Sequence, residues 1–392
     1  MKEWFDLAKK REGAWQANRR YLHANAEVGF YLPKTSAFVV GKLRELGYKP
    51  TRCGRGAIVA TAGKGGKTVL LRADMDGLPI AEQTGLAFAC KTGKMHACGH
   101  DMHTAMLLGA AELLKAREDK LSGRIKLLFQ PAEEILEGAE QAVKGGVLQS
   151  PKVDVAIALH VVTGGDFQTG TALFLEGVGA PSADYFSIKV EGKGCHGSSP
   201  WEGVDALTIA ARILLGLQEI HARELKIGEK AALTVGSLQT GGAGNVLSDS
   251  VEMKGTLRAY DEGVRERIKL RLQELAKNIA KAFRGKARVR FQGGCPTLKN
   301  DGDLTEFAYR ELRAALGEDK VIRMQGGGGA SEDFAYIAKE IPSMMFALAA
   351  GARKEGFAQP LHHPAVQFDE RAISQGGAML AGLAAAWLKK HK

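Results

Sequence analysis

The residues best suited to chemistry gather in the stretch MHACGHDMHTA, residues 95–105. Within eight residues it places three imidazoles, a thiol and a carboxyl group, on His96, Cys98, His100, Asp101 and His103. The whole chain has only 10 histidines and 5 cysteines, and four of those fifteen lie here. Thiolate, imidazole and carboxylate together favour zinc and related first-row metals, and a thiolate disfavours magnesium or calcium as the only occupant. The stretch therefore predicts part of a metal centre.

Three further segments end in side chains that can bind a metal. Glu133 and Glu134 close the run GRIKLLFQPAEE, His160 closes KVDVAIALH, and His362 and His363 lie in LHHP. Each has an ordinary alternative: acids in the first turn of a helix, a structural histidine after a strand, or a pair of surface histidines. Four separate elements that end in such groups favour one shared metal centre over coincidence.

The adjacent glutamates suit a hydrolase that uses a metal-activated water. One carboxylate would bind the metal while the other takes and returns the proton. The pattern alone allows Glu134 as ligand and Glu133 as base, or the reverse. A cysteine nucleophile, Cys98 acting with His100 or His103, stays open as an alternative. So does a metal-binding protein without turnover, although a free carboxylate beside the metal favours an enzyme.

The elements that must position these residues follow an α/β pattern. Residues 4–24 and 106–116 have helical spacing, whereas 67–76, 123–134 and 152–160 are short apolar runs that end in polar residues. Strands that alternate with helices predict a mixed, mostly parallel sheet flanked by helices. In such sheets, functional groups gather at the carboxyl ends of the strands.

The pattern changes near residue 181. Over about 182–294 the elements follow the order β-α-β-β-α-β, which is typical of an α+β unit with an antiparallel sheet. The α/β pattern then resumes, with helices expected at 303–317 and 332–340, a strand in SMMFALAAG and a closing helix. We therefore expect a discontinuous catalytic domain, 1–181 and 295–392, interrupted by an inserted domain.

Composition narrows the class of protein. The chain has 392 residues, 45% hydrophobic and 25% charged, which is ordinary for a globular protein with two cores. No apolar run approaches the ~20 residues of a membrane span, and the N-terminus lacks the apolar core of a signal peptide. Five widely spaced cysteines do not suggest disulfides, so we expect a cytoplasmic protein. The net charge of +10 is spread along the chain, which favours an ordinary solvated basic surface over nucleic acid as a partner and is also compatible with small anionic substrates.

Seven motifs in order carry a family resemblance. They are LRADMDGLPI, MHACGHDMHTA, FQPAEE, ALH, GKGCHGSSP, GGGGASEDFAYI and LHHPAVQFDE. Together they resemble the metal-dependent amidohydrolases of the aminoacylase and carboxypeptidase superfamily. Within it the chain is similar to the subgroup of hippurate hydrolases, indole-3-acetyl-amino-acid hydrolases and N-acetyl-diaminopimelate deacetylases. The resemblance covers nearly the whole chain, and implies a two-metal catalytic domain and an inserted β-α-β-β-α-β domain for lid closure and dimerisation.

The resemblance also implies roles for single residues. Carried over motif by motif, the family's metal ligands fall on Cys98, His100, Glu134, His160 and His362. The catalytic base falls on Glu133, and Asp76 falls where the family keeps an acid that orients a metal-binding side chain. In the inserted domain, His196 matches a histidine that holds the substrate and its developing oxyanion, often in the active site of the partner subunit. Asn245 and Arg258 resemble residues that meet the substrate's carboxylate.

The implied activity is hydrolysis of the amide bond in N-acetyl, N-benzoyl or N-indoleacetyl amino acids, with a dipeptidase or carboxypeptidase as the alternative. Two divalent ions are implied, Mn²⁺ or Zn²⁺ first, with Co²⁺ and Ni²⁺ compatible with the same ligands. The resemblance further implies a homodimer through the inserted domain, whereas the charge distribution and the lack of an apolar span indicate no nucleic-acid or membrane partner. Departures from the family pattern bear on substrate choice: Ala26 precedes Glu27, Met102 stands where glycine is common, and no proline follows His160 closely.

Overall fold

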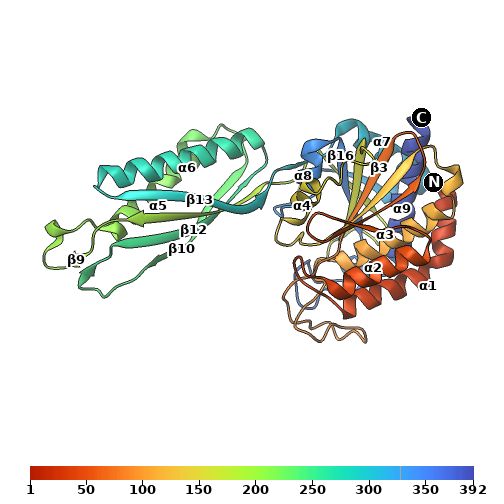
Figure 1. Cartoon of the computed structure of the whole chain (residues 1–392), viewed down its shortest axis with the longest axis horizontal. Coiled ribbons are helices and arrows are strands. Elements are labelled where there is room, and N and C mark those ends of the chain that lie inside the picture. The colour runs from red at the N-terminus through yellow and green to blue at the C-terminus, as the bar shows by residue number, and fades with distance from the viewer. Residues whose placement is uncertain (327) are drawn as a thin grey trace. The chain divides into compact units, whose positions relative to one another are not determined.

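The computed structural model describes residues 1–326 and 328–392 (Figure 1). Residue 327, in the motif GGGGASEDFAYI, lies outside the described residues. The chain forms two compact units. Unit 1 comprises residues 1–179, 298–326 and 333–392, and unit 2 comprises 180–297 and 328–332. None of the described helices is both long enough and apolar enough to cross a bilayer.

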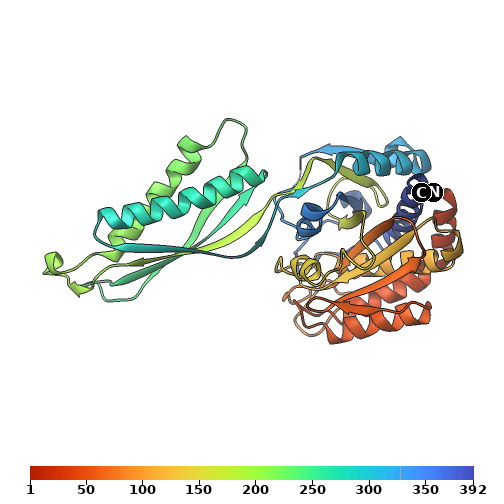
Figure 2. The same ribbon diagram turned by 45° about the horizontal axis from the view of Figure 1, so that its top comes forward.

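Unit 1 is built on an eight-stranded sheet (Figures 1 and 2). In spatial order its strands are β1 (Thr51–Cys53), β2 (Ala57–Gly63), β4 (Arg124–Gln130), β3 (Thr68–Asp74), β5 (Val155–Val162), β16 (Ser343–Ala349), β6 (Ala172–Glu176) and β15 (Val321–Gln325). The pairs β4–β3, β3–β5, β5–β16 and β6–β15 are parallel, and the other neighbours are antiparallel. The central strand β3 is buried along its whole length, as in parallel sheets covered on both faces. The predicted α/β class with a mostly parallel sheet is confirmed.

Helices flank this sheet. They are α1 (Lys2–Ala24), α2 (Pro33–Glu45), α3 (His100–Lys115), α4 (Gly138–Lys144), α7 (Gly302–Leu316), α8 (Ala335–Glu340) and α9 (Arg371–Lys390). Helices α1, α3 and α9 pack against one another, and α3 and α9 also contact β3 and β5. Trp15 of α1 is fully buried between glycines of the other two helices. A Cβ at Gly109 or Gly377 would lie 2.5 or 2.7 Å from its indole ring, so this close packing requires glycine and fixes α3.

Two details differ from the sequence interpretation. Strand β5 continues to Val162, so His160 lies inside the strand rather than at its end. The segment after β4 is a turn instead of the start of a helix, because Ala132 (φ 62°) and Leu136 (φ 57°) adopt left-handed backbone conformations and α4 begins only at residue 138.

Unit 2 contains a four-stranded antiparallel sheet in the order β10-β12-β8-β13. Its main elements, in chain order, are β8 (Ala183–Glu191), α5 (Ala206–Glu219), β10 (Ala231–Thr240), β12 (Ser250–Ala259), α6 (Glu262–Ala282) and β13 (Lys286–Cys295). Alternate residues of β8 and β12, such as Ile188 and Met253, are buried in a core shared with α5 and α6. Two short strands, β9 (Cys195–His196) and β11 (Val246–Leu247), pair beside it. The short strands β7 (Val178–Ala180) and β14 (Leu298–Lys299) lie where the chain passes between the units.

Candidate metal centre

A glycine turn lets Cys98 and His100 point toward the same place. Gly99 has a left-handed backbone (φ 86°), and α3 starts at the next residue. A Cβ at Gly99 would overlap Cγ2 of Val161 and lie 3.1 Å from the ring of Phe368. Both the conformation and the space therefore require glycine here. The cysteine and the histidine on either side are buried.

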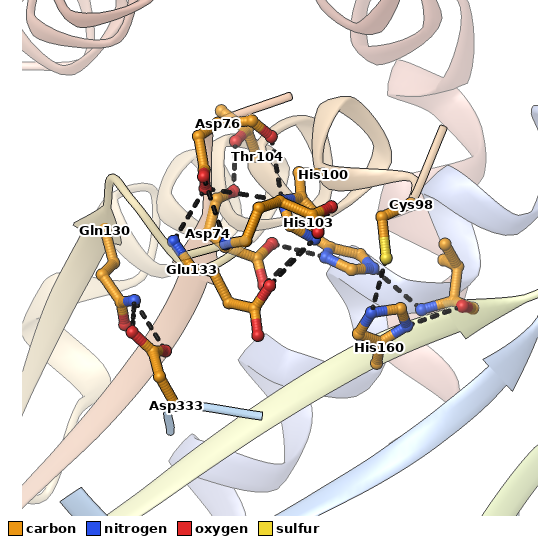
Figure 3. A network of polar contacts seen from close by, with 12 residues as sticks. Asp74, Asp76, Cys98, His100, His103, Thr104, Gln130, Glu133, His160 and Asp333 are labelled. Atoms are coloured by element: carbon orange, nitrogen blue, oxygen red, sulfur yellow. Dashed lines mark hydrogen bonds and ion pairs between the residues drawn. The ribbon is translucent and has the colours of Figure 1, made fainter. Parts of the chain in front are cut away.

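His160 joins this pair from β5 (Figure 3). Its Nε2 lies 3.5 Å from Sγ of Cys98, and ligand atoms of Cys98, His100 and His160 all lie within 4.8 Å of one another. Burial lowers the pKa of His160 to about 3, and burial also raises the pKa of the Cys98 thiol. At neutral pH His160 is thus the neutral imidazole that binds metals.

The two glutamates reach the cluster from the turn after β4. Nε2 of His100 lies 3.9 Å from Oε2 of Glu133 and 3.8 Å from Oε1 of Glu134. Oε2 of Glu134 lies 3.7 Å from Nε2 of His362. Burial raises the pKa of Glu134 to about 7; the charge of His100 opposes this rise, while the charge of Asp76 adds to it. The surroundings of the two adjacent glutamates thus differ: Glu134 lies within 4 Å of two histidines, His100 and His362.

His362, rather than His363, faces this group. The backbone N–H of His362 donates to the carbonyl of Ala97 (2.9 Å), which ties its loop to the segment before Cys98. Its side chain is 54% exposed, so it forms the open edge of the cluster. Nδ1 of His363 accepts a local hydrogen bond from the backbone N–H of Ala365 (3.1 Å).

Within the described part of the chain, two buried polar atoms of the cluster lack a hydrogen-bond partner, and a metal ion would give them one. Nε2 of His100 and Oε1 of Glu134 are buried without a hydrogen-bond partner among the described residues. A buried polar atom left unpaired costs roughly 1–3 kcal/mol, which a bound cation would remove. The donors around them are sulfur, imidazole nitrogen and carboxylate oxygen, the set that suits zinc and similar metals.

Asp76 holds the glutamate turn and the histidine together. Its carboxylate accepts the backbone N–H groups of Glu133 (3.0 Å) and Glu134 (3.2 Å). Its backbone carbonyl lies 2.9 Å from Nδ1 of His100 and can only accept, so Nδ1 donates and Nε2 faces the cluster.

Sequence reasoning missed Asp74 and misjudged His103. Nδ1 of His103 lies 2.6 Å from Oδ1 of Asp74, and its Nε2 accepts the backbone N–H of Val161 (2.8 Å). Since both ring nitrogens are engaged, His103 is not available as a base for Cys98. Asp74 also accepts from Arg72 (2.7 Å) and lies 3.7 Å from Nε2 of His100. The acid-rich end of RADMD was the available signal for this buried carboxylate.

A second missed residue, Asp333, braces the same region from a distant motif. It accepts from the Gln130 side chain (2.8 Å), the Ala139 backbone N–H (2.8 Å) and the Arg72 guanidinium (2.9 Å). Figure 3 shows it beside Gln130. These contacts fix both ends of the turn that carries the two glutamates, which no local sequence pattern could indicate.

The three remaining candidates lie in unit 2. His196, on β9, is exposed, with Nδ1 2.7 Å from Oγ of Ser198. Asn245 is exposed, and its backbone carbonyl accepts from Gly197 (2.7 Å). Arg258, on β12, places its guanidinium 5.7 Å from the centre of the Tyr185 ring. Their roles toward a substrate stay predictions.

Comparisons with known proteins identify the family of this chain. The sequence pattern of peptidase family M20/M25/M40 matches residues 70–386. The N-acetyl-L-cysteine deacetylase of Bacillus subtilis (strain 168) is 38% identical over 360 residues, which cover 91% of this chain and 83% of the relative. The N-acyl-L-amino acid amidohydrolase of Geobacillus stearothermophilus is 37% identical over 335 residues, 84% of this chain and 86% of the relative.

A solved structure of the same family has a similar fold. A Bacillus subtilis protein described as a dinuclear metal-binding peptidase of the M20 family superposes with a TM-score of 0.82 at 30% identity, covering 97% of this chain and 99% of that one. The matching motifs, the buried donor set and these relatives together lead to one assignment. The chain belongs to peptidase family M20/M25/M40 and is an amide-bond hydrolase.

Proposed function

We propose that this protein is a di-metal amidohydrolase that cleaves N-acyl amino acids to a carboxylate and a free amino acid. The observation that carries the proposal is the second carboxylate. Glu133 lies beside a cluster of sulfur, nitrogen and oxygen donors. Of the two glutamates, Glu134 contacts both His100 and His362, so we assign Glu134 as the ligand and Glu133 as the base. A site built only to hold metal has no use for such a base. The relatives named for deacetylation and for N-acyl amino acids support the substrate class.

Five side chains would hold the ions: Cys98, His100, Glu134, His160 and His362. When bound, two divalent ions, Mn²⁺ or Zn²⁺ in the first place, would polarise the acyl carbonyl and lower the pKa of a water. Glu134 is the ligand of the glutamate pair because it contacts both His100 and His362. Glu133 then takes a proton from the attacking water and returns it to the leaving nitrogen.

Asp76 acts through these residues as a positioning group. Its carboxylate holds the backbone of both glutamates, so it sets the separation between base and ligand. Its carbonyl holds His100 in the orientation that presents Nε2.

The inserted domain would complete the substrate site. By resemblance to the family, His196 stabilises the developing oxyanion after lid closure, and Asn245 and Arg258 meet the carboxylate of the amino acid. The same resemblance supports a homodimer formed through unit 2. These roles rest on matching motifs.

A dipeptidase or carboxypeptidase is the second candidate, since one similar structure is described as a peptidase. The two activities differ in the group on the acyl side. A peptide substrate with a free amine needs an acidic partner there, whereas an acyl group needs an apolar one.

The deciding experiment measures metal content and turnover together. Wild type, Glu133→Ala and the control Glu140→Ala, a change on the neighbouring helix α4, are assayed on N-acetyl, N-benzoyl and N-indoleacetyl amino acids and on matching dipeptides. We expect equal metal in all three proteins, with turnover of the acyl series lost only in Glu133→Ala. Preference for dipeptides would favour the peptidase. Turnover without metal would overturn the proposal and return attention to Cys98 as a nucleophile.

A further inference from the structure

An apolar cavity lies in unit 1 on the strands next to His160. Its volume is about 290 Å³, and it is lined by residues of β5, β16, β6 and β15 with the loops that follow β5 and β16. Figure 1 labels β16, one of its central strands. The lining includes Val162, Leu173, Leu175, Met324, Ala347 and Ala349.

Strand register places lining residues of this cavity next to His160 in the sheet. Ala347 is the cross-strand partner of His160, and Ala349 is the partner of Val162. On the next strand, Leu173 is opposite Ala347. Residues directly opposite each other, and residues two apart in a strand, point to the same face of a sheet. The cavity therefore lies on the face of the sheet toward which His160 points. Its lining includes Val162 and Ala347, which are next to His160 on that face.

The cavity then extends away from the cluster. Neighbouring strands lie about 4.8 Å apart, so β6 lies ~10 Å from β5 and β15 lies ~14 Å from it. Leu175 and Met324 are opposite each other at this far end. The end of the cavity near His160 is lined by the small side chains of alanines, and the far end by larger side chains. The cavity therefore has space for a substrate group beside His160.

The lining suits an uncharged group. None of the ten lining residues, all of them described, has an ionisable side chain, and Thr163 has the only side-chain polar atom among them. At about 30 Å³ of liquid volume for each water-sized group, this space has room for roughly nine or ten non-hydrogen atoms as a lower bound. An acetyl group would leave most of this space empty, whereas a benzoyl group or a chain of six to eight carbons would fill it.

We propose that this cavity, the β16 pocket, is the acyl subsite and makes the enzyme prefer apolar acyl groups larger than acetyl. The inference rests on the proposed function. The α-carboxylate of the substrate is an unsuitable occupant because it would carry a charge into an uncharged lining.

A larger groove, of about 620 Å³ and lined by Met1, Trp4 and Lys390 among others, has no described lining residue in the strands of the sheet, whereas the β16 pocket includes Ala347, the cross-strand partner of His160. Arg353 lies next to the β16 pocket and donates from Nε to the carbonyl of Gly164 (2.6 Å). A carboxylate on the acyl group, as in an N-succinyl substrate, is therefore the sharpest competing chemistry.

The test is a chain-length series on the metal-loaded full-length enzyme. N-acetyl, N-butanoyl, N-hexanoyl, N-octanoyl, N-benzoyl and N-succinyl derivatives of L-methionine are compared by kcat/KM. We expect a two- to fourfold rise for each added methylene up to six to eight carbons, the upper value corresponding to about 0.8 kcal/mol per buried methylene. The succinyl derivative should be at least tenfold poorer than the hexanoyl one.

Variants then locate the effect. Ala349→Leu fills the pocket and should lower the hexanoyl-to-acetyl ratio of kcat/KM at least tenfold. Leu175→Ala removes contacts at the far end and should lower the octanoyl-to-butanoyl ratio two- to fourfold. Ala386→Leu, in the remote groove lined by Met1 and Trp4, is the matched control and should change neither ratio.

A binding measurement separates this inference from the proposed function. Calorimetry with the Glu133→Ala protein should show at least tenfold tighter binding of N-hexanoyl- than of N-acetyl-methionine, and Ala349→Leu should abolish the difference. If the wild type hydrolyses no acyl amino acid but this binding pattern appears, the proposed function is wrong and the assignment of the β16 pocket as the acyl-binding site is supported. Three results would contradict the assignment of the β16 pocket as the acyl subsite: values of kcat/KM that do not change with acyl chain length, a preference for the succinyl derivative, or equal binding of the hexanoyl and acetyl ligands.

Discussion

Glu133 and Glu134 are neighbours in the chain, yet their carboxylates meet different surroundings. Glu134 lies between His100 and His362, at 3.8 and 3.7 Å, whereas Glu133 lies 3.9 Å from Nε2 of His100. We expect Glu134→Gln to weaken metal binding strongly, because it removes a charged ligand. Glu133→Gln should keep the metal and lower kcat by about 10²–10⁴-fold, the usual contribution of a general base. Metal titration by calorimetry with steady-state kinetics checks both; loss of metal in Glu133→Gln would reverse the two roles.

A further prediction at this scale concerns Asp76. Asp76→Asn keeps the size of the side chain but weakens its acceptance of two backbone N–H groups. We expect a 10–100-fold loss in metal affinity or activity, the range found for residues that orient ligands. The measurement is kcat/KM against metal concentration. If excess metal restores full activity, Asp76 supports affinity alone and does not set the position of Glu133.

Spacing and residue type predicted which segments carry the site but left the glutamates' roles open. The family resemblance assigned them, and the contacts of Glu134 agree with that assignment. The pairing of Asp74 with His103, and that of Asp333 with Gln130, could not be predicted because the partners are far apart in the chain. Only the folded sheet brings such carboxylates to a histidine and an amide.

At the scale of elements, the turn at Gly99 is the most sensitive junction. Gly99→Ala forces a side chain into a left-handed backbone position and into Val161. We expect it to destabilise the protein by about 1–3 kcal/mol and to weaken metal binding, because it separates Cys98 from His100. Urea unfolding and metal titration measure the two effects.

Gly13→Ala, in the middle of α1 where added atoms meet open space, is its control. It should be neutral or stabilise by up to ~1 kcal/mol. Equal behaviour of the two variants would mean that the Gly99 turn does not constrain the cluster.

Helix α1 is tied to the start of α3 by a buried histidine. His23 Nδ1 lies 2.9 Å from Asp101 and Nε2 lies 3.0 Å from Glu82. Burial lowers the pKa of His23, but the hydrogen bonds to Asp101 and Glu82 outweigh burial and raise it to about 9. Above about pH 6.5 the unfolded chain loses the proton that His23 keeps in the folded protein. The contribution of His23 to the free energy of unfolding is therefore complete below pH 6.5 and is lost as the pH rises toward 9.

The stability gap between wild type and His23→Gln should therefore shrink by roughly 3 kcal/mol between pH 6 and pH 9. Urea midpoints across this range measure it. His391→Gln, at the end of α9, is the comparison variant and is measured over the same pH range. A constant gap would show that His23 is neutral in the folded protein.

Periodicity predicted the order of the elements well, and their ends less well. β5 extends past His160 because Val162 still pairs with Ala349 of β16, a strand nearly two hundred residues later. The turn after β4 looked like the start of a helix because acids follow a proline. Its left-handed residues, Ala132 and Leu136, have no sequence signature such as glycine.

At the scale of the whole molecule, the candidate ligands come from four separate segments between residues 98 and 362, all in unit 1. A bound metal would therefore cross-link distant parts of one unit. Metal at 100 times its Kd should stabilise that unit by about 2.7 kcal/mol. Amides of β3 and α3 that exchange by unfolding of unit 1 should then slow about 100-fold, whereas those of β12 and α6, which belong to the separate core of unit 2, should keep their rates.

Hydrogen exchange with and without a chelator measures this difference, and Glu134→Gln is the matched control because it removes a ligand while leaving both cores intact. It should show little protection by metal. Equal slowing in both units would mean that metal stabilises the chain as a single cooperative structure. No slowing in unit 1 would show that the cluster around Cys98 is not where the metal binds.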